Sequence, residues 1–284
     1  YSFFWLSKET SILINNWFMM YFLSVVLIGT VYPIFLDVIS SQKISVGPPF
    51  YHKLINPFLI PFLLMMAIGP KLKWIKSQLE DKIYLISFLI ISILLAFLVL
   101  KNFNQNILIN TILISSALYL FFITLRDFFV KKYKNISQNI AHFGFSLLIL
   151  SILFNNIFAS EIITNLKVGE TFENSKTKIV FESVDQKKEK NYNAIIANFS
   201  ISNLNGEKDR FSPELRIYNQ PVIATSEADI KTTLMSDKFI VINLVQNQDF
   251  FNVRYQVKPF MLWIWLSVIL ISFAGIVSFL QKRS

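Results

Sequence analysis

Six long apolar runs occur along the chain, and one polar stretch separates the last run from the others. The runs cover residues 17–37, 54–70, 83–100, 106–126, 139–158 and 260–280. Because a helix of roughly 20 residues crosses the hydrocarbon core of a bilayer, each run predicts a transmembrane helix. The second run contains Pro57 and Pro61 and ends at Gly69-Pro70, so it predicts either a kinked or tilted spanning helix or a re-entrant segment.

The polar stretch, residues 159–258, shows the alternation that is typical of β-strands. Alternating and β-branched segments occur at 177–184, 193–202, 210–218, 238–245 and 251–257. An Asn-Gly pair within 203–209 predicts a hairpin turn, and Pro213 and Pro221 predict strand edges or bends. We expect a small antiparallel barrel or sandwich of about five to seven strands.

The distribution of charge orients the predicted helices. The chain carries a net charge of +9, yet residues 159–258 hold 13 Lys/Arg and 13 Asp/Glu, so the excess lies in the membrane part. Eleven basic residues fall on one side of the predicted membrane: Lys8, Lys71, Lys73, Lys76, Lys82, Arg126, Lys131, Lys132, Lys134, Lys282 and Arg283. The other side holds three: Lys43, Lys53 and Lys101. By the positive-inside rule the first side is the cytoplasmic or matrix side.

Together these patterns predict a polytopic α-helical membrane protein with about six transmembrane helices and one extracytoplasmic small antiparallel β domain. Residues 1–158 would form the first five helices, 159–258 the β domain, and 259–284 the last helix with a short basic cytoplasmic tail. We expect residues 1–16 to be an interfacial segment or the end of an earlier helix. The positive charge reports topology, so no nucleic-acid partner is expected. Cysteine is absent, which excludes disulfides, thiolate metal sites and cysteine nucleophiles.

Only two histidines occur, His52 and His142. His142 lies about four residues into its apolar run, roughly 6 Å below the membrane edge. One interpretation is a neutral imidazole hydrogen-bonded to a neighbouring helix or to water; the other is an axial ligand of haem iron. The small residues Ala141, Gly144 and Ser146 leave room beside it for a flat ring or for a close helix. His52 is expected in a loop on the opposite side, so the two cannot ligate one iron.

Two tryptophans open the last apolar run. Trp263 and Trp265 lie a turn or two into the predicted helix, after Lys258. Tryptophans at this depth are typical of the aromatic belt that anchors a helix at the membrane interface. The alternative is an aromatic platform that faces a bound planar cofactor.

Several segments, taken in order from residue 7 to 280, resemble one family. The segments are "NNWFMMYFLSVVLIGTVYPIFLDV", "ISVGPPFYHKLINPFLIPFLLMMAIGP", "AHFGFSLLILSI", "RFSPELRIYNQPVIATSEADI" and "YQVKPFMLWIWLS". They are similar to the C-terminal half of the CcmF-type haem lyases of cytochrome c maturation. The sequence departs from the family pattern at Ser226, where the family has threonine, and near Asn243; both departures concern loop detail.

The resemblance implies an enzyme of the bacterial inner membrane or, alternatively, of the mitochondrial inner membrane. Such lyases take haem from a haem chaperone and attach it to the Cys-x-x-Cys-His thiols of apocytochrome c. They also hold a haem b between two membrane histidines, and the family's Ala-His-x-Gly histidine falls on His142. The family's Trp-rich haem motif, its flanking histidines and the second membrane histidine belong to the N-terminal half and are not in this sequence.

The resemblance therefore implies a haem-lyase part that needs an N-terminal half, which would supply the second haem ligand, together with other maturation subunits. No catalytic residue is assigned. Arg216, Tyr218 and Glu227 are expected on the outer face of the β domain, where haem, chaperone and apocytochrome meet. For Arg216 the choice is between a haem propionate and an ion pair with Glu214 or Glu227. The alternative function is a non-catalytic membrane scaffold that docks partners.

Overall fold

The computed structural model describes residues 7–40, 44–74, 82–101, 107–130, 135–203, 206, 208–245 and 249–281. The chain forms two compact units, one of Tyr1–Leu150 with Leu266–Ser284 and one of Ser151–Trp265. Several residues used in the sequence interpretation lie outside the described ranges, namely Lys43, Lys76, Lys131, Lys132, Lys134, Asn205, Lys282 and Arg283.

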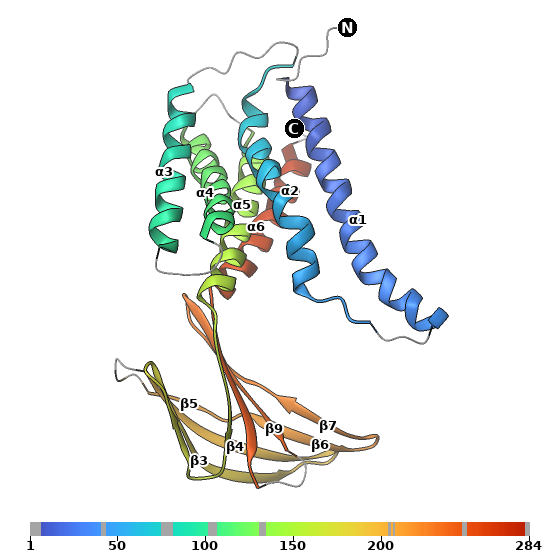
Figure 1. The fold of residues 1–284 in the computed structure, drawn as a ribbon, viewed down its shortest axis with the longest axis vertical. Coiled ribbons are helices and arrows are strands. Elements are labelled where there is room, and N and C mark those ends of the chain that lie inside the picture. Colours follow the sequence, from blue (N-terminus) through green and yellow to red (C-terminus); the bar gives the residue numbers. More distant parts are fainter. Residues whose placement is uncertain are drawn as a thin grey trace. The chain divides into compact units, whose positions relative to one another are not determined.

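The membrane part is built from helices (Figure 1). They are α1 (Lys8–Ser40), α2 (Pro48–Ile68), α3 (Lys82–Leu100), α4 (Ile107–Phe129), α5 (Ile136–Phe158) and α6 (Met261–Gln281). Within the described residues, six helices are long and apolar enough to cross a membrane. The predicted class of a multi-pass helical protein is confirmed, and each helix overlaps one of the predicted apolar runs.

Helix α2 is continuous despite its internal prolines. It runs for 21 residues through Pro57 and Pro61, which is about 31 Å of helix, enough to span a hydrocarbon core of roughly 30 Å. It starts at Pro48, six positions before the predicted start, because proline fits the first turn, where its missing N–H is not needed. His52 is therefore an exposed residue in the first turns of a helix, and the expected loop position is wrong.

Helix α1 is longer than the predicted run, at 33 residues. It includes residues 8–16, which were expected to be an interfacial segment or the end of an earlier helix. It runs antiparallel to α2: the Lys8 N–H donates to the Lys73 carbonyl at 3.0 Å, and Gly29 meets Tyr51 at the other end. A Cβ at Gly29 would lie 2.6 Å from the Tyr51 hydroxyl oxygen, so glycine is needed for this close approach.

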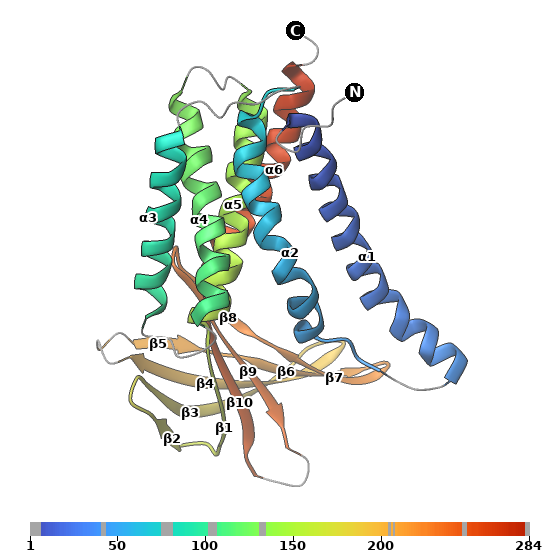
Figure 2. The same ribbon diagram turned by 45° about the horizontal axis from the view of Figure 1, so that its top comes forward.

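The polar stretch folds into two antiparallel sheets (Figure 2). The first has the order β1 (Ser160–Leu166), β10 (Phe251–Pro259), β9 (Ser236–Leu244), β8 (Asp229–Thr232). The second has the order β2 (Thr171–Glu173), β3 (Thr177–Lys188), β4 (Tyr192–Asn203), β6 (Glu214–Asn219), β7 (Val222–Glu227), with β5 (Lys208–Phe211) also paired to β4. The β4–β5 pairing confirms the predicted hairpin.

The described residues form ten strands instead of the five to seven expected. Pro213 divides the expected strand 210–218 into β5 and β6, because proline cannot donate to the ladder. The strands β1, β2, β7 and β8 were not among the segments named from the sequence, and the short edge strands β2 and β8 contain too few residues to show an alternation. Their backbone pairing comes from the neighbouring long strands, a tertiary effect that a local pattern does not contain.

The two sheets share one apolar core, so the β domain is a sandwich. Phe181 on β3 and Phe199 on β4 stack with ring centroids 4.5 Å apart. Ile240, Ile242 and Val253 of the other sheet belong to the same buried cluster. Alternating residues of each central strand face this core, as expected for sheets with one solvated side.

An ion pair also joins the two sheets. The Lys238 ammonium on β9 donates to Asp209 Oδ2 on β5 at 2.7 Å, and this hydrogen bond lowers the pKa of Asp209. A carboxyl group with a lowered pKa stabilises the fold above its unfolded pKa, and that contribution is lost as the pH falls through the folded pKa.

We expect Asp209→Asn to lower the free energy of unfolding by about 0.5–1 kcal/mol at neutral pH and to have no effect in acid. Thermal unfolding of the detergent-solubilised chain at both pH values measures this. An equal cost at both would contradict it, and Lys178→Gln, in an exposed pair with Glu173, is the control.

Candidate functional site

His142 on α5 borders a small cavity among the helices. The cavity is about 160 Å³ in volume and is lined by Lys8, Ser11, Ile12, Asn15, Met65, Met66, Gly69, Pro70, Gln138 and His142. Half of these side chains are polar or charged, within helices that are otherwise apolar. Polar groups at membrane depth are costly and usually face a cavity or a partner, so this is the first place to search for function.

The imidazole of His142 is oriented by the backbone of α2. Its ring forms a hydrogen bond with the Met66 backbone carbonyl. That carbonyl lies four residues before Pro70, where an α-helix would normally supply the N–H that satisfies it, and proline has none. The nitrogen of His142 that donates to Met66 carries the proton, so the other nitrogen retains its lone pair.

This arrangement can hold a metal from one side only. His52 lies fourteen positions before Met66 on the same helix, which is about 21 Å along the axis. The two histidines therefore cannot ligate one iron. The described residues contain no group of three or more His, Cys, Asp or Glu side chains placed to hold a metal ion.

A haem fits these residues as one half of its environment. A metal-bound histidine usually donates its second ring N–H to a carbonyl or carboxylate, which fixes the ring and the tautomer, and His142 does so. The cavity is smaller than the roughly 300–1,000 Å³ of typical ligand sites. His142 is thus the candidate axial ligand among the described residues, and a second ligand and the opposite wall would have to come from other residues.

The small residues near His142 serve helix packing. A Cβ at Gly144 would lie 3.0 Å from Ile271 Cγ1 and 3.3 Å from the Ile271 backbone nitrogen, so this glycine admits a close α6. The Ser146 hydroxyl donates to the carbonyl of Phe143 at 2.8 Å within its own helix. Of the two uses considered for these residues, the close helix is the one that the structure contains at Gly144.

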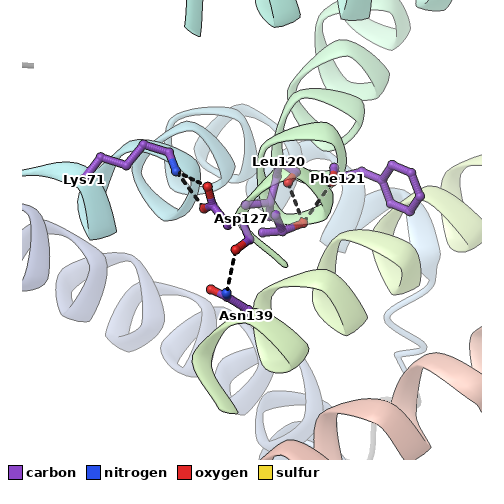
Figure 3. A network of polar contacts seen from close by, with 6 residues as sticks. Lys71, Leu120, Phe121, Asp127 and Asn139 are labelled. Carbon is purple, nitrogen blue, oxygen red and sulfur yellow. Dashed lines mark hydrogen bonds and ion pairs between the residues drawn. The ribbon is translucent and has the colours of Figure 1, made fainter. Parts of the chain in front are cut away.

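A buried ion pair lies near this cavity, and sequence reasoning missed it (Figure 3). The Lys71 ammonium donates to both carboxylate oxygens of Asp127, at 2.7 and 2.6 Å, and the two side chains are only 2% and 6% exposed. The Asn139 side-chain amide donates to the Asp127 backbone carbonyl at 3.4 Å. The available signal was Asp127 itself, a carboxylate that directly follows Arg126 in a predicted connection whose other charged residues are all basic.

The strands β6 and β7 contain the site residues that were predicted in the β domain. Arg216 pairs with Glu214 at 2.8 Å, and its guanidinium lies 5.1 Å from the centroid of the Tyr192 ring. Tyr218 packs on the same Tyr192 ring, with centroids 5.4 Å apart. Glu227 lies opposite Glu214 in the ladder. Arg216, Tyr218 and Glu227 thus belong to adjacent strands, and Arg216 has the carboxylate partner expected of a surface ion pair.

The two predicted tryptophans occupy the first turns of α6. The Trp263 indole N–H donates to the Leu234 carbonyl at 3.0 Å, which ties the start of the helix to the turn between β8 and β9. Trp265 is 63% exposed. An indole with a bonded N–H and an exposed neighbour suits a membrane-interface position.

A hollow on the outer face of the four-stranded sheet was also missed. It measures about 560 Å³ and is lined by Ala159, Ser160, Glu161, Phe239, Val241, Asn243, Arg254, Gln256 and Lys258. Glu161 accepts hydrogen bonds from Gln256 and Arg254, and these bonds lower the pKa of Glu161. The Ser226 hydroxyl donates to Asn243 Oδ1 at 2.6 Å, so the two departures from the family pattern contact each other.

Comparison with known proteins gives a consistent result. A family model described as the CcmF C-terminal beta-sandwich matches residues 157–259. The cytochrome c-type biogenesis proteins CcmF of Pseudomonas fluorescens and Haemophilus influenzae are each 26% identical to this chain and match 98% of it. The match covers 44% and 45% of those proteins, so the chain spans less than half of their length.

A solved structure shares the fold. The protein named cytochrome c heme lyase CcmF superposes with a TM-score of 0.72 at 20% identity, over 96% of this chain and 46% of that one. The similarity includes the six helices as well as the sandwich, since nearly the whole chain is covered. Residues 157–259 therefore match the CcmF C-terminal beta-sandwich family, and the chain as a whole is similar to a part of the CcmF cytochrome c-type biogenesis proteins.

Proposed function

We propose that this chain is the C-terminal part of a membrane haem lyase that attaches haem to apocytochrome c, and that His142 is an axial ligand of a haem b. The observation that carries the proposal is the hydrogen bond from His142 to the Met66 carbonyl, which Pro70 leaves without its helical partner. It fixes one nitrogen as donor and leaves the other able to bind iron. The names of the relatives and of the similar solved protein support the same role.

The residues of this chain divide the work between two places. In the membrane, His142 would hold the iron from one side, and the Met66 carbonyl keeps its ring oriented. When bound, haem b would supply an electron for reduction of the incoming haem iron. The second axial ligand is proposed to come from the N-terminal part of the lyase, because six-coordinate haem b takes two.

The β domain is proposed as the surface where haem, the haem chaperone and apocytochrome c meet. It would lie on the periplasmic side of a bacterial inner membrane or in the mitochondrial intermembrane space. Arg216, Tyr218 and Glu227 lie on adjacent strands of this domain. A guanidinium suits a haem propionate. For this contact Arg216 would exchange the carboxylate of Glu214 for the propionate. Retention of full haem attachment by Arg216→Ala would remove this part of the proposal.

The lyase function is tested by covalent labelling of a reporter. The chain is co-expressed with the N-terminal part of a CcmF protein and an apocytochrome c in cells that lack their own lyase. We expect haem that stays on the reporter through a denaturing gel, and none when either part is omitted, because thioether bonds survive denaturation. Absence of label with both parts present and folded would favour the alternative of a non-catalytic scaffold.

A further inference from the structure

The ion pair of Lys71 and Asp127 is unusual for its place. Both side chains are almost fully buried, at the ends of two helical segments that could cross a membrane. Removing two charges from water is costly, and an apolar pair of similar size is often at least as stable. Stabilisation of the fold is therefore a weak reason for the presence of this ion pair. Fixing the relative positions of the two helical segments is a stronger one.

The pair connects the elements that orient His142. Lys71 ends the 3₁₀ turn η1 (Gly69–Lys71), which directly follows α2 and its Met66 carbonyl. Asp127 lies in the last turn of α4, and its backbone carbonyl accepts from Asn139. Asn139 precedes His142 by three positions on α5, so the two residues lie on one face of that helix.

The surroundings of the pair add a further cation. The Arg126 guanidinium lies over the Tyr84 ring at 3.6 Å from its centroid, and the Lys71 ammonium lies 5.9 Å from the same centroid. The aromatic face attracts both cations, so the Lys71 ammonium is attracted by the Tyr84 ring as well as by the Asp127 carboxylate. Each of the two charged partners thus has contacts that restrict its position.

We propose that Lys71 and Asp127, with Asn139, are positioning residues for His142: they lock the end of α2 and the start of α5 so that the Met66 carbonyl and the imidazole meet. This inference rests on the proposed function, because it concerns the orientation of the ligand assigned there. In this arrangement Lys71 and Asp127 act on the position of the imidazole through Met66 and Asn139.

The first test measures how readily His142 is chemically modified in the absence of haem. The detergent-solubilised chain is treated with diethylpyrocarbonate, and modification of His142 is compared with that of His52 by mass spectrometry. In the double variant Lys71→Met/Asp127→Leu, we expect the ratio of His142 to His52 modification to rise several-fold, because the ring is no longer fixed. The matched control is Lys178→Met/Glu173→Leu, an exposed pair on the β-sandwich. An unchanged ratio in a folded double variant would overturn the proposal.

A second variant tests the proposal in case the double variant does not fold. Asn139→Leu removes the tie between α5 and the Asp127 carbonyl while it leaves the ion pair intact, and we expect the same change in the ratio. An Asn139→Leu protein that folds and shows the wild-type ratio would also contradict the proposal.

The third measurement separates this inference from the lyase proposal. With the N-terminal part present, the absorption spectrum of bound haem is compared between the wild-type chain and the double variant. A low-spin band in the wild type that becomes partly high-spin in the variant supports the positioning role. An identical band in both overturns it and leaves the haem site standing. Absence of a band in the wild type would contradict the proposed haem site, and the histidine-modification ratio would still decide the positioning role.

Discussion

Replacement of His142 by alanine is expected to abolish the low-spin b-type absorption of this chain co-expressed with the N-terminal part of a CcmF protein. The described residues offer one imidazole that is oriented by a backbone carbonyl at membrane depth. Without it, haem iron would lose one of two axial ligands, and low-spin b-type iron needs both. Absorption spectra of the oxidised and dithionite-reduced membranes measure the loss directly.

The matched control for this experiment is His52→Ala. His52 is exposed in the first turns of α2, about 21 Å along the helix from Met66, so its removal is expected to leave the band unchanged. A band that persists in His142→Ala, or that disappears equally in His52→Ala, would show that His142 is a packed helix residue. The hydrogen bond to Met66 would then be its whole role, as for a neutral histidine that satisfies a neighbouring helix.

The sequence predicted the helices well because their signal is local. The free energy of transferring an apolar run into lipid depends on the residues of that run. The composition of about 20 consecutive residues is therefore enough to predict a spanning helix. The boundaries were less accurate where special residues decide them. Pro48 begins α2 because proline suits a first helical turn, and Lys8 begins α1 because polar residues extend beyond the membrane in the same helix. The short strands β2 and β8 were missed since only their neighbours define them.

The candidate site was predictable only in part, for a related reason. His142 could be found because a histidine inside an apolar run is conspicuous without any knowledge of the fold. Its contact with Met66 could not, although Pro70 already indicated a carbonyl without a helical partner. The ion pair joins residues that are 56 positions apart. No local pattern connects Lys71 with Asp127, and the lysine read in isolation is one more positive-inside charge.

Replacement of Asp127 by leucine is expected to destabilise the helical unit by about 3–5 kcal/mol. The substitution leaves the Lys71 ammonium, which is 2% exposed in its side chain, without a carboxylate in a site closed to water. The cost is that of an uncompensated buried charge, which exceeds the value of the pair itself. Denaturant titration in detergent micelles, followed by tryptophan fluorescence, measures the change in the free energy of unfolding.

The double variant Lys71→Met/Asp127→Leu separates the cost of an unpaired charge from the value of the pair. Because two apolar side chains of similar volume replace the two ions, its stability is expected to lie close to that of the wild type, within about 1 kcal/mol. A double variant as unstable as Asp127→Leu would show that the ion pair stabilises the fold, and the positioning role would lose its physical argument. Recovered stability together with a freed His142 would show instead that the charges are there to fix geometry, since the chain folds as well without them.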